Sequence, residues 1–170
     1  QTIDEITPNW LTLALSKGGV LSGASVSGVE VERIGLMEGF MGVIARLTPE
    51  YDNPADHLPP TLIAKLPDAD PDQRAAQSSA FKTEAGFYST FPADDSTIHP
   101  VCYFVGSDPK GDDHALLIED LSNGRSASMI RHMPLDDAAI VFNSLAGLHA
   151  PHWNSPELES LSWAVDGRTR

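Results

Sequence analysis

Two opposite charges lie in apolar surroundings in this chain, nineteen positions apart. Lys65 falls in the run Thr61-Leu-Ile-Ala-Lys-Leu-Pro67, which is typical of a strand, and Glu84 falls on the apolar stripe of a helix predicted over 72–91. A buried and unpaired charge is costly, so we expect the strand lysine and the helix glutamate to meet. An ammonium group held by a carboxylate in this way is suited to binding the phosphates of a nucleotide.

Simpler explanations exist for both charges. Strand alternation places Ile63 and Lys65 on one face and the main apolar face, Leu62, Ala64 and Leu66, on the other. A lysine can also simply protect an edge strand from aggregation. Glu84 could be a solvated helix residue. The chain would then be a plain α+β interaction domain in which the two side chains never meet.

Three glycines lie close together in the segment Gly35-Leu-Met-Glu-Gly-Phe-Met-Gly42. Because glycine lets backbone amides approach a ligand closely, a turn with Gly35, Gly39 and Gly42 could cover phosphates, and Phe40 could cap the site. The spacing fits neither G-x-G-x-x-G nor a Walker loop, which ends in Gly-Lys-Ser/Thr. An ordinary hairpin turn is the alternative.

The elements that must position these residues follow from periodicity and turn signals. Thr7-Pro8 predicts a helix start, and the segment 49–60, with its prolines, predicts a loop. The predicted strands are 26–34, 41–48, a third from Thr61 to Pro67, 101–105 and 115–121. The stripe of the helix over 72–91 is Ala76, Ala80, Glu84, Phe87 and Phe91, and a last helix over 135–153 is expected to bury Leu135, Ala139, Phe142, Ala146, His149 and Trp153. The pattern predicts an α+β fold: a five-stranded antiparallel sheet with an inserted helix, an N-terminal helix and a C-terminal linking helix.

Composition narrows the possible partners. The 170 residues are 41% hydrophobic and 21% charged, enough for one domain with a real core, and the net charge of −13 argues against nucleic acid or an anionic membrane as partner. No apolar run reaches the roughly 18 residues of a membrane span. The single cysteine, Cys102, is expected to fill the core of a strand and fits a cytoplasmic location.

Two polar clusters predict no chemistry. His149 and His152 are three residues apart, but no cysteine or acid at ligand spacing accompanies them, so we expect no metal site. Asp112, Asp113 and His114 share a turn without a recognisable nucleophile, so they predict no catalytic triad.

The order of the motifs resembles the aminoglycoside phosphotransferase and choline kinase-like superfamily, especially its ecdysteroid-kinase-like branch. The resemblance rests on the glycine turn and on four motifs: Leu62-Ile-Ala-Lys65, Glu84-Ala-Gly-Phe-Tyr88, Leu117-Ile-Glu-Asp-Leu121 and Leu145-Ala-Gly-Leu-His-Ala-Pro-His-Trp153. It covers nearly the whole chain and implies a protein-kinase-like small lobe that binds ATP in a cleft beneath the sheet. Lys65 would contact the α- and β-phosphates, Glu84 would orient Lys65, and the backbone from Glu119 through Asp120 to Leu121 would pair with the adenine edge.

The resemblance also implies a division of the chain and an activity. Residues 1–121 would form the small lobe, and residues 122–170 the hinge exit, the linking helix and the start of a missing large lobe. The parent protein would transfer the γ-phosphate of ATP to a hydroxyl of a small molecule. The catalytic aspartate and the Mg²⁺ ligands of such enzymes belong to the large lobe, on a His-Gly-Asp-like loop and a later aspartate, and neither motif occurs here. We therefore expect this chain to hold no catalytic residue and to be inactive alone; the alternative is a half-kinase module that binds a nucleotide or a partner and never catalyses. The acceptor and the oligomeric state do not follow from the sequence.

Overall fold

The computed structural model describes residues 2–35, 42–93, 98–107, 114–124 and 133–164. Five strands form one antiparallel sheet in the order β1-β2-β3-β5-β4. Their bounds are Val26–Ile34 (β1), Val43–Tyr51 (β2), Leu62–Leu66 (β3), Cys102–Ser107 (β4) and His114–Glu119 (β5). The helices are Pro8–Lys17 (α1), Pro71–Thr90 (α2) and Leu135–His149 (α3), with short 3₁₀ turns at Ile3–Glu5 (η1), Ala150–His152 (η2) and Pro156–Ser160 (η3). The expected α+β class and five-stranded antiparallel sheet are confirmed.

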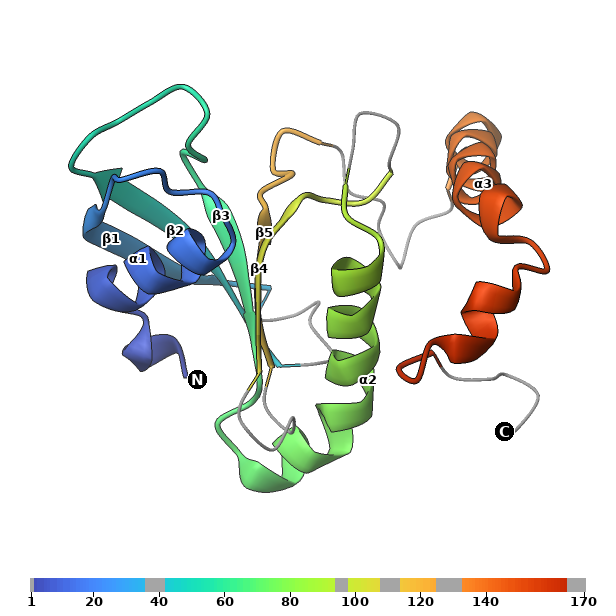
Figure 1. Cartoon of the computed structure of the whole chain (residues 1–170), viewed down its shortest axis with the longest axis horizontal. Coiled ribbons are helices and arrows are strands. Elements are labelled where there is room, and N and C mark those ends of the chain that lie inside the picture. Colours follow the sequence, from blue (N-terminus) through green and yellow to red (C-terminus); the bar gives the residue numbers. More distant parts are fainter. Residues whose placement is uncertain (1, 36–41, 94–97, 108–113, 125–132, 165–170) are drawn as a thin grey trace.

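Helix α1 covers one face of the sheet (Figure 1). It begins as expected, because the Thr7 hydroxyl accepts a hydrogen bond from the Trp10 amide and Pro8 occupies the first helical position. Leu11 and Leu15 are fully buried and pack against Leu62 and other apolar side chains of the central strands. This face therefore carries the main hydrophobic core.

Helix α2 lies on the opposite face, against β4 and β5 (Figure 1). The expected stripe was wrong in register: the helix buries Phe81 and Ala85, whereas Ala76 is exposed. Periodicity alone did not distinguish the two registers, because small and aromatic residues occur on both sides of the helix. In the observed register Glu84 lies beside the buried stripe and faces the edge of the packed surface.

Strand β2 is longer than expected and continues through Pro49 to Tyr51. The prolines of 49–60 predict a loop from Pro49 onward, and proline is tolerated in a strand only where its missing N–H is not needed by the ladder. At this point β2 pairs with β1 through Val29, while its pairing with β3 has already ended at Leu47. The open side of β2 therefore accommodates the proline.

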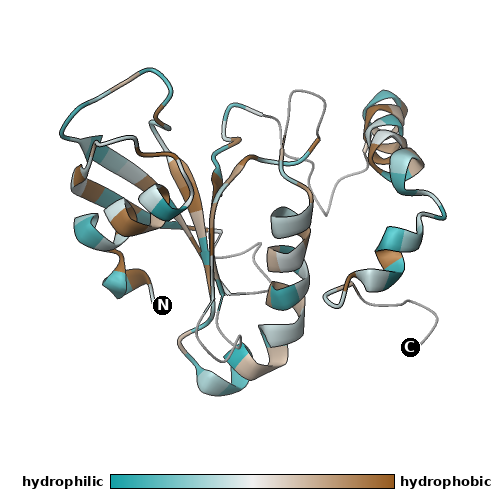
Figure 2. Cartoon of the chain, in the orientation of Figure 1, coloured by the Kyte–Doolittle hydropathy of each residue, from teal (hydrophilic) through white to brown (hydrophobic). Residues whose placement is uncertain are grey.

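The expectation for the C-terminal helix was wrong in two respects. Helix α3 ends at His149 rather than Trp153, and none of its residues is buried. Leu135 is 88% exposed and Phe142 is 70% exposed, so the predicted apolar stripe faces outward. Figure 2 shows that α3 carries both apolar and polar residues along its length. The periodicity correctly predicted a helix, but it carries no information about whether this chain supplies the surface that covers it.

A glycine within α2 has a packing role that the sequence analysis did not recognise. A Cβ on Gly86 would lie 2.1 Å from Cγ of Trp163. The Trp163 indole nitrogen donates to the Thr90 hydroxyl at 3.0 Å, and the Thr83 hydroxyl donates to the Trp163 carbonyl at 3.3 Å. The segment around Trp163 thus packs on the side of α2 that faces away from the sheet.

The described residues contain no helix that combines the length and the apolar character needed to cross a bilayer.

Candidate functional site

Lys65 and Glu84 meet. The Lys65 Nζ and Glu84 Oε1 atoms form a hydrogen-bonded ion pair between β3 and α2. The two side chains are 25% and 27% exposed, so the pair is partly shielded and still open to a ligand. The expected pairing is confirmed, and the alternative in which the two side chains never meet is wrong.

The alternation of β3 places Lys65 on the face of the sheet opposite the α1 core. Leu62, Ala64 and Leu66 are fully buried, while Ile63 and Lys65 are only partly buried. Side chains of one strand alternate between faces, and directly paired residues share a face. The pairing therefore puts a set of side chains on one face, which we call the site face: Ile44, Arg46, Ile63, Lys65, Leu116 and Ile118.

Helix α2 covers only part of the site face. Its Ala85 packs with Leu116 and Ile118 of β5, both of which are buried. Ile44 on β2 and Ile63 on β3 are left partly exposed beside the Lys65 and Glu84 pair. An apolar strip next to a polar group of defined position is typical of small-molecule sites.

The glycine-bearing turn ends next to Lys65. Ile34 pairs with Ile44, and Ile44 pairs with Lys65, so the base of the turn between β1 and β2 borders the lysine strand. Gly35 and Gly42 have φ angles of +70° and +75°, which favour glycine. A Cβ on Gly42 would also lie 2.3 Å from the Leu66 carbonyl oxygen, so this position needs a glycine on two grounds. The other two predicted turn residues, Gly39 and Phe40, lie outside the described residues.

The predicted adenine segment lies at the end of β5, where side chains matter as well as backbone. The Glu119 amide donates to the Val101 carbonyl at 2.8 Å, and its carboxylate accepts from the Val101 amide at 3.1 Å. Glu119 therefore anchors the entry to β4. Leu121 is 54% exposed, and within the described part of the chain its amide has no hydrogen-bond partner.

Asp120 takes part in an ion pair that the sequence analysis missed. Its Oδ2 atom accepts from Arg46 Nε at 2.8 Å. The signal that could have revealed this pair is an arginine between Ala45 and Leu47 in the apolar strand 43–47, where a partly buried guanidinium needs a partner. The site face thus has an ion pair at each end, one on Lys65 and one on Arg46.

The separation of these two ends suits a nucleotide. Lys65 pairs with Leu116, and Leu62, three residues earlier on β3, pairs with Glu119. Three strand residues span about 10 Å. The distance from the Lys65 region to the segment that follows Glu119 is therefore comparable to the distance from the base to the phosphates of a nucleotide.

Burial and charge influence two groups on the α2 side of the sheet. Burial, with a smaller contribution from the nearby Glu84 carboxylate, raises the pKa of Tyr88 to about 12. Burial also raises the pKa of Cys102, outweighing a hydrogen bond to the Phe104 carbonyl. Cys102 is half-buried on β4, and a raised pKa makes its thiol a poor nucleophile.

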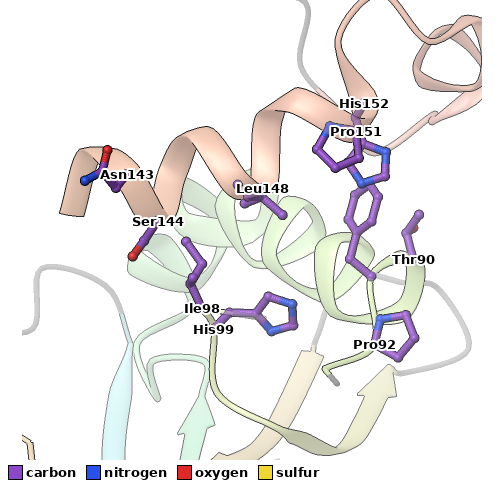
Figure 3. A pocket seen from close by; sticks show the side chains of 11 residues that line it. Thr90, Pro92, Ile98, His99, Asn143, Ser144, Leu148, Pro151 and His152 are labelled. Carbon is purple, nitrogen blue, oxygen red and sulfur yellow. The ribbon is translucent and has the colours of Figure 1, made fainter. Parts of the chain in front are cut away.

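A cavity lies away from the site face. It has a volume of about 790 Å³ and lies between the C-terminal end of α2 and helix α3, with His99 and His152 among its lining residues (Figure 3). None of the lining side chains comes from β2 or β3, so the cavity is separate from the site face. The His152 ring contacts the Phe91 ring in a tilted arrangement, with ring centres 4.8 Å apart and an angle of 59° between the planes, whereas His149 does not line this cavity.

For the remaining polar clusters the sequence predicts neither a metal site nor a catalytic triad. Within the described ranges no three His, Cys, Asp or Glu side chains come together as metal ligands. His114 is buried at the start of β5, while Asp112 and Asp113 fall outside the described residues.

Searches against protein-family models, curated proteins and solved structures find no match for this chain.

Proposed function

We propose that this chain is the ATP-binding small lobe of a phosphotransferase that acts on a hydroxyl group of a small molecule. The observation that carries the proposal is the Lys65 and Glu84 ion pair, which lies on a partly open sheet face near Gly35 and Gly42, the two glycines that flank the predicted turn. An ammonium group on a rigid strand, oriented by a helix carboxylate, offers a fixed positive charge to phosphate oxygens.

Each part of the site face has a role in this proposal. Lys65 binds the α- and β-phosphates, and Glu84 keeps its ammonium group in place. The turn between Gly35 and Gly42 covers the phosphates. The partly exposed Ile44 and Ile63 provide an apolar surface for the base, and the backbone after Glu119 pairs with its edge.

The reaction itself needs groups from outside this chain. The acceptor oxygen attacks the γ-phosphorus, the bond from that phosphorus to the β,γ-bridging oxygen breaks, and ADP leaves with the electron pair. The acceptor proton passes to a base, and Mg²⁺ balances charge on the phosphates. The sequence has no His-Gly-Asp-like loop that could supply these groups, so we assign nucleotide binding rather than turnover to this chain. A second candidate, a non-catalytic module that binds a nucleotide or a partner, would use the same Lys65 and Glu84 pair.

Calorimetric titration with ATP and Mg²⁺ tests the proposal. The Lys65→Ala variant of the native-length protein should lose at least about tenfold in ATP affinity, because a charge-assisted bond to phosphate is worth about 1.5–3 kcal/mol. Lys82→Ala is the matched control, since Lys82 is an exposed lysine on α2. Unchanged ATP affinity and phosphotransfer rate in Lys65→Ala would show that the assignment is wrong.

Phosphotransfer by the native-length protein separates the two candidates. ATP consumption that depends on a hydroxylated acceptor would support the phosphotransferase. ATP binding without any such consumption, across a panel of hydroxylated small molecules, would favour the non-catalytic module.

A further inference from the structure

The second ion pair of the site face joins three elements of the sheet. Arg46 on β2 donates through Nε to Asp120 at 2.8 Å and through Nη1 to Glu32 on β1 at 3.0 Å. The two acceptors differ in environment: the Asp120 side chain is 4% exposed, whereas the Glu32 side chain is 60% exposed. The Asp120 contact is therefore shielded from water, and the Glu32 contact is a surface contact of small energetic weight.

Asp120 in turn shapes the backbone that follows β5. Its Oδ1 atom accepts from the Ser122 amide at 3.0 Å, and the Leu121 carbonyl accepts from the Gly124 amide at 2.8 Å. One carboxylate thus binds Arg46 with one oxygen and the turn with the other. The Leu121 amide has no partner among the described residues and lies between these two fixed points, in a residue that is 54% exposed.

The position of this turn depends on Arg46. A carboxylate that is almost fully buried needs a cation or several donors, and removing its partner leaves a costly unpaired charge. Without Arg46, Asp120 would keep its hydrogen bonds from Thr61 and Ser122 but would lose the cation that fixes the direction of its carboxylate beneath the turn. The planar guanidinium also fixes the carboxylate in direction, which a lysine ammonium does less well.

We propose that Arg46 is a positioning residue that sets base specificity: through Asp120 it aims the Leu121 amide at the edge of a purine and favours adenine over guanine. This inference rests on the proposed nucleotide site. N1 of adenine is a hydrogen-bond acceptor that an amide N–H can meet, whereas N1 of guanine carries a hydrogen. A fixed donor therefore finds a partner on adenine and faces another donor on guanine, and an unpaired polar group is a strong source of discrimination.

The test compares three ligands on the native-length protein: ATP, GTP and inorganic tripolyphosphate. In Arg46→Met we expect ATP affinity to fall about tenfold, the preference for ATP over GTP to shrink by a similar factor, and tripolyphosphate affinity to stay unchanged. Lys65→Ala should weaken the binding of all three ligands, because it removes a contact with their phosphates. Glu32→Gln is the matched control, since it changes the other partner of Arg46 and should leave the ATP-to-GTP ratio as it is.

Arg46→Lys covers the case in which Arg46→Met does not fold. It retains the charge opposite Asp120 but not the guanidinium geometry, so it should fold and show a reduced ATP-to-GTP ratio. An equal loss for ATP, GTP and tripolyphosphate in the Arg46 variants would mean that Arg46 only supports the fold, and an unchanged ratio would overturn the inference directly. If Lys65→Ala weakens ATP binding while the Arg46 variants keep the wild-type ratio of ATP affinity to GTP affinity, the inference about Arg46 fails and the proposed function stands. If the wild-type protein does not bind ATP, the proposed function fails and the inference with it.

Discussion

The two faces of the sheet differ in how completely apolar packing covers them. The α1 face is a continuous apolar core in which Leu47 and Leu62 are fully buried. The opposite face has a smaller apolar cluster under α2, and it places the Lys65 and Arg46 ion pairs where the helix cover ends. Ion pairs contribute little net stability compared with apolar packing, so the placement of the Lys65 and Arg46 pairs on the α2 face indicates a division of labour between the two faces. The α1 face carries the main apolar core, and the α2 face carries the two ion pairs on which the proposed nucleotide site rests.

Neighbouring residues of β3 provide the sharpest test of this division. Leu62→Ala should destabilise the protein by about 2–5 kcal/mol, because it leaves a cavity in a fully buried core. Ile63→Ala, one residue along and on the site face, should cost less than about 2 kcal/mol but weaken ATP binding. Urea unfolding and ATP titration of both variants measure the contrast. Equal losses of stability would contradict the division between the faces.

The two glycines that flank the turn are expected to differ in cost. Gly42→Ala combines a positive φ angle with a steric conflict at the Leu66 carbonyl, and should destabilise by about 1–3 kcal/mol and lower ATP affinity. Gly35 also has a positive φ, but the nearest atom to an added Cβ is 3.8 Å away, so Gly35→Ala should cost less. Thermal unfolding of the two variants measures the difference. A Gly35 variant that is the less stable of the two would refute the assigned contact.

The ionisation of Asp120 makes the stability that the Arg46 and Asp120 pair contributes depend on pH. Burial alone would raise the pKa of Asp120, but the Arg46 guanidinium and the Ser122 amide outweigh it and hold the pKa below its ordinary value of 3.8. The ionised carboxylate therefore contributes stability that is fully present above pH 3.8 and is lost as the pH falls below that value, toward the folded-state pKa.

Asp120→Asn should remove this contribution, at a cost of about 1–3 kcal/mol near neutral pH. Urea unfolding at a series of pH values should show the gap between wild type and variant narrowing below pH 3.8. Asp52→Asn is a useful comparison, because the pKa of Asp52 is also lowered, chiefly by the Ser25 amide, at an exposed site remote from Arg46. A gap for Asp120→Asn that does not change with pH would count against the Arg46 pair.

The smallest expected effect concerns the outer side of α2. Alanine is favoured over glycine within a helix by about 1 kcal/mol, but a Cβ on Gly86 would collide with Trp163. Gly86→Ala should therefore stabilise a Trp163→Ala background by up to about 1 kcal/mol and give less benefit, or a loss, in the wild-type background. Denaturant unfolding of the four proteins measures the coupling. The same gain in both backgrounds would show that Trp163 does not pack on Gly86.

The sequence was informative wherever a local pattern decides the structure. Alternation in β3, the Thr7 cap and the need of Lys65 for a partner each predicted an observed feature. The register of α2 and the exposure of α3 were not predictable, because a period of 3.6 residues does not say which side is covered or by what. Arg46 and Asp120 are 74 positions apart, and only the pairing of β2, β3 and β5 brings them together.

A double-mutant cycle on ATP affinity tests most directly whether the α2 face is a nucleotide site built on the Lys65 and Glu84 pair. The cycle compares Lys65→Met, Glu84→Gln and the double variant in the native-length protein, with unfolding measured alongside. If Glu84 acts by orienting Lys65, each single change weakens ATP binding and the double variant is little worse than Lys65→Met. Losses that simply add, or single variants that bind ATP as the wild type does, would contradict this role for the pair.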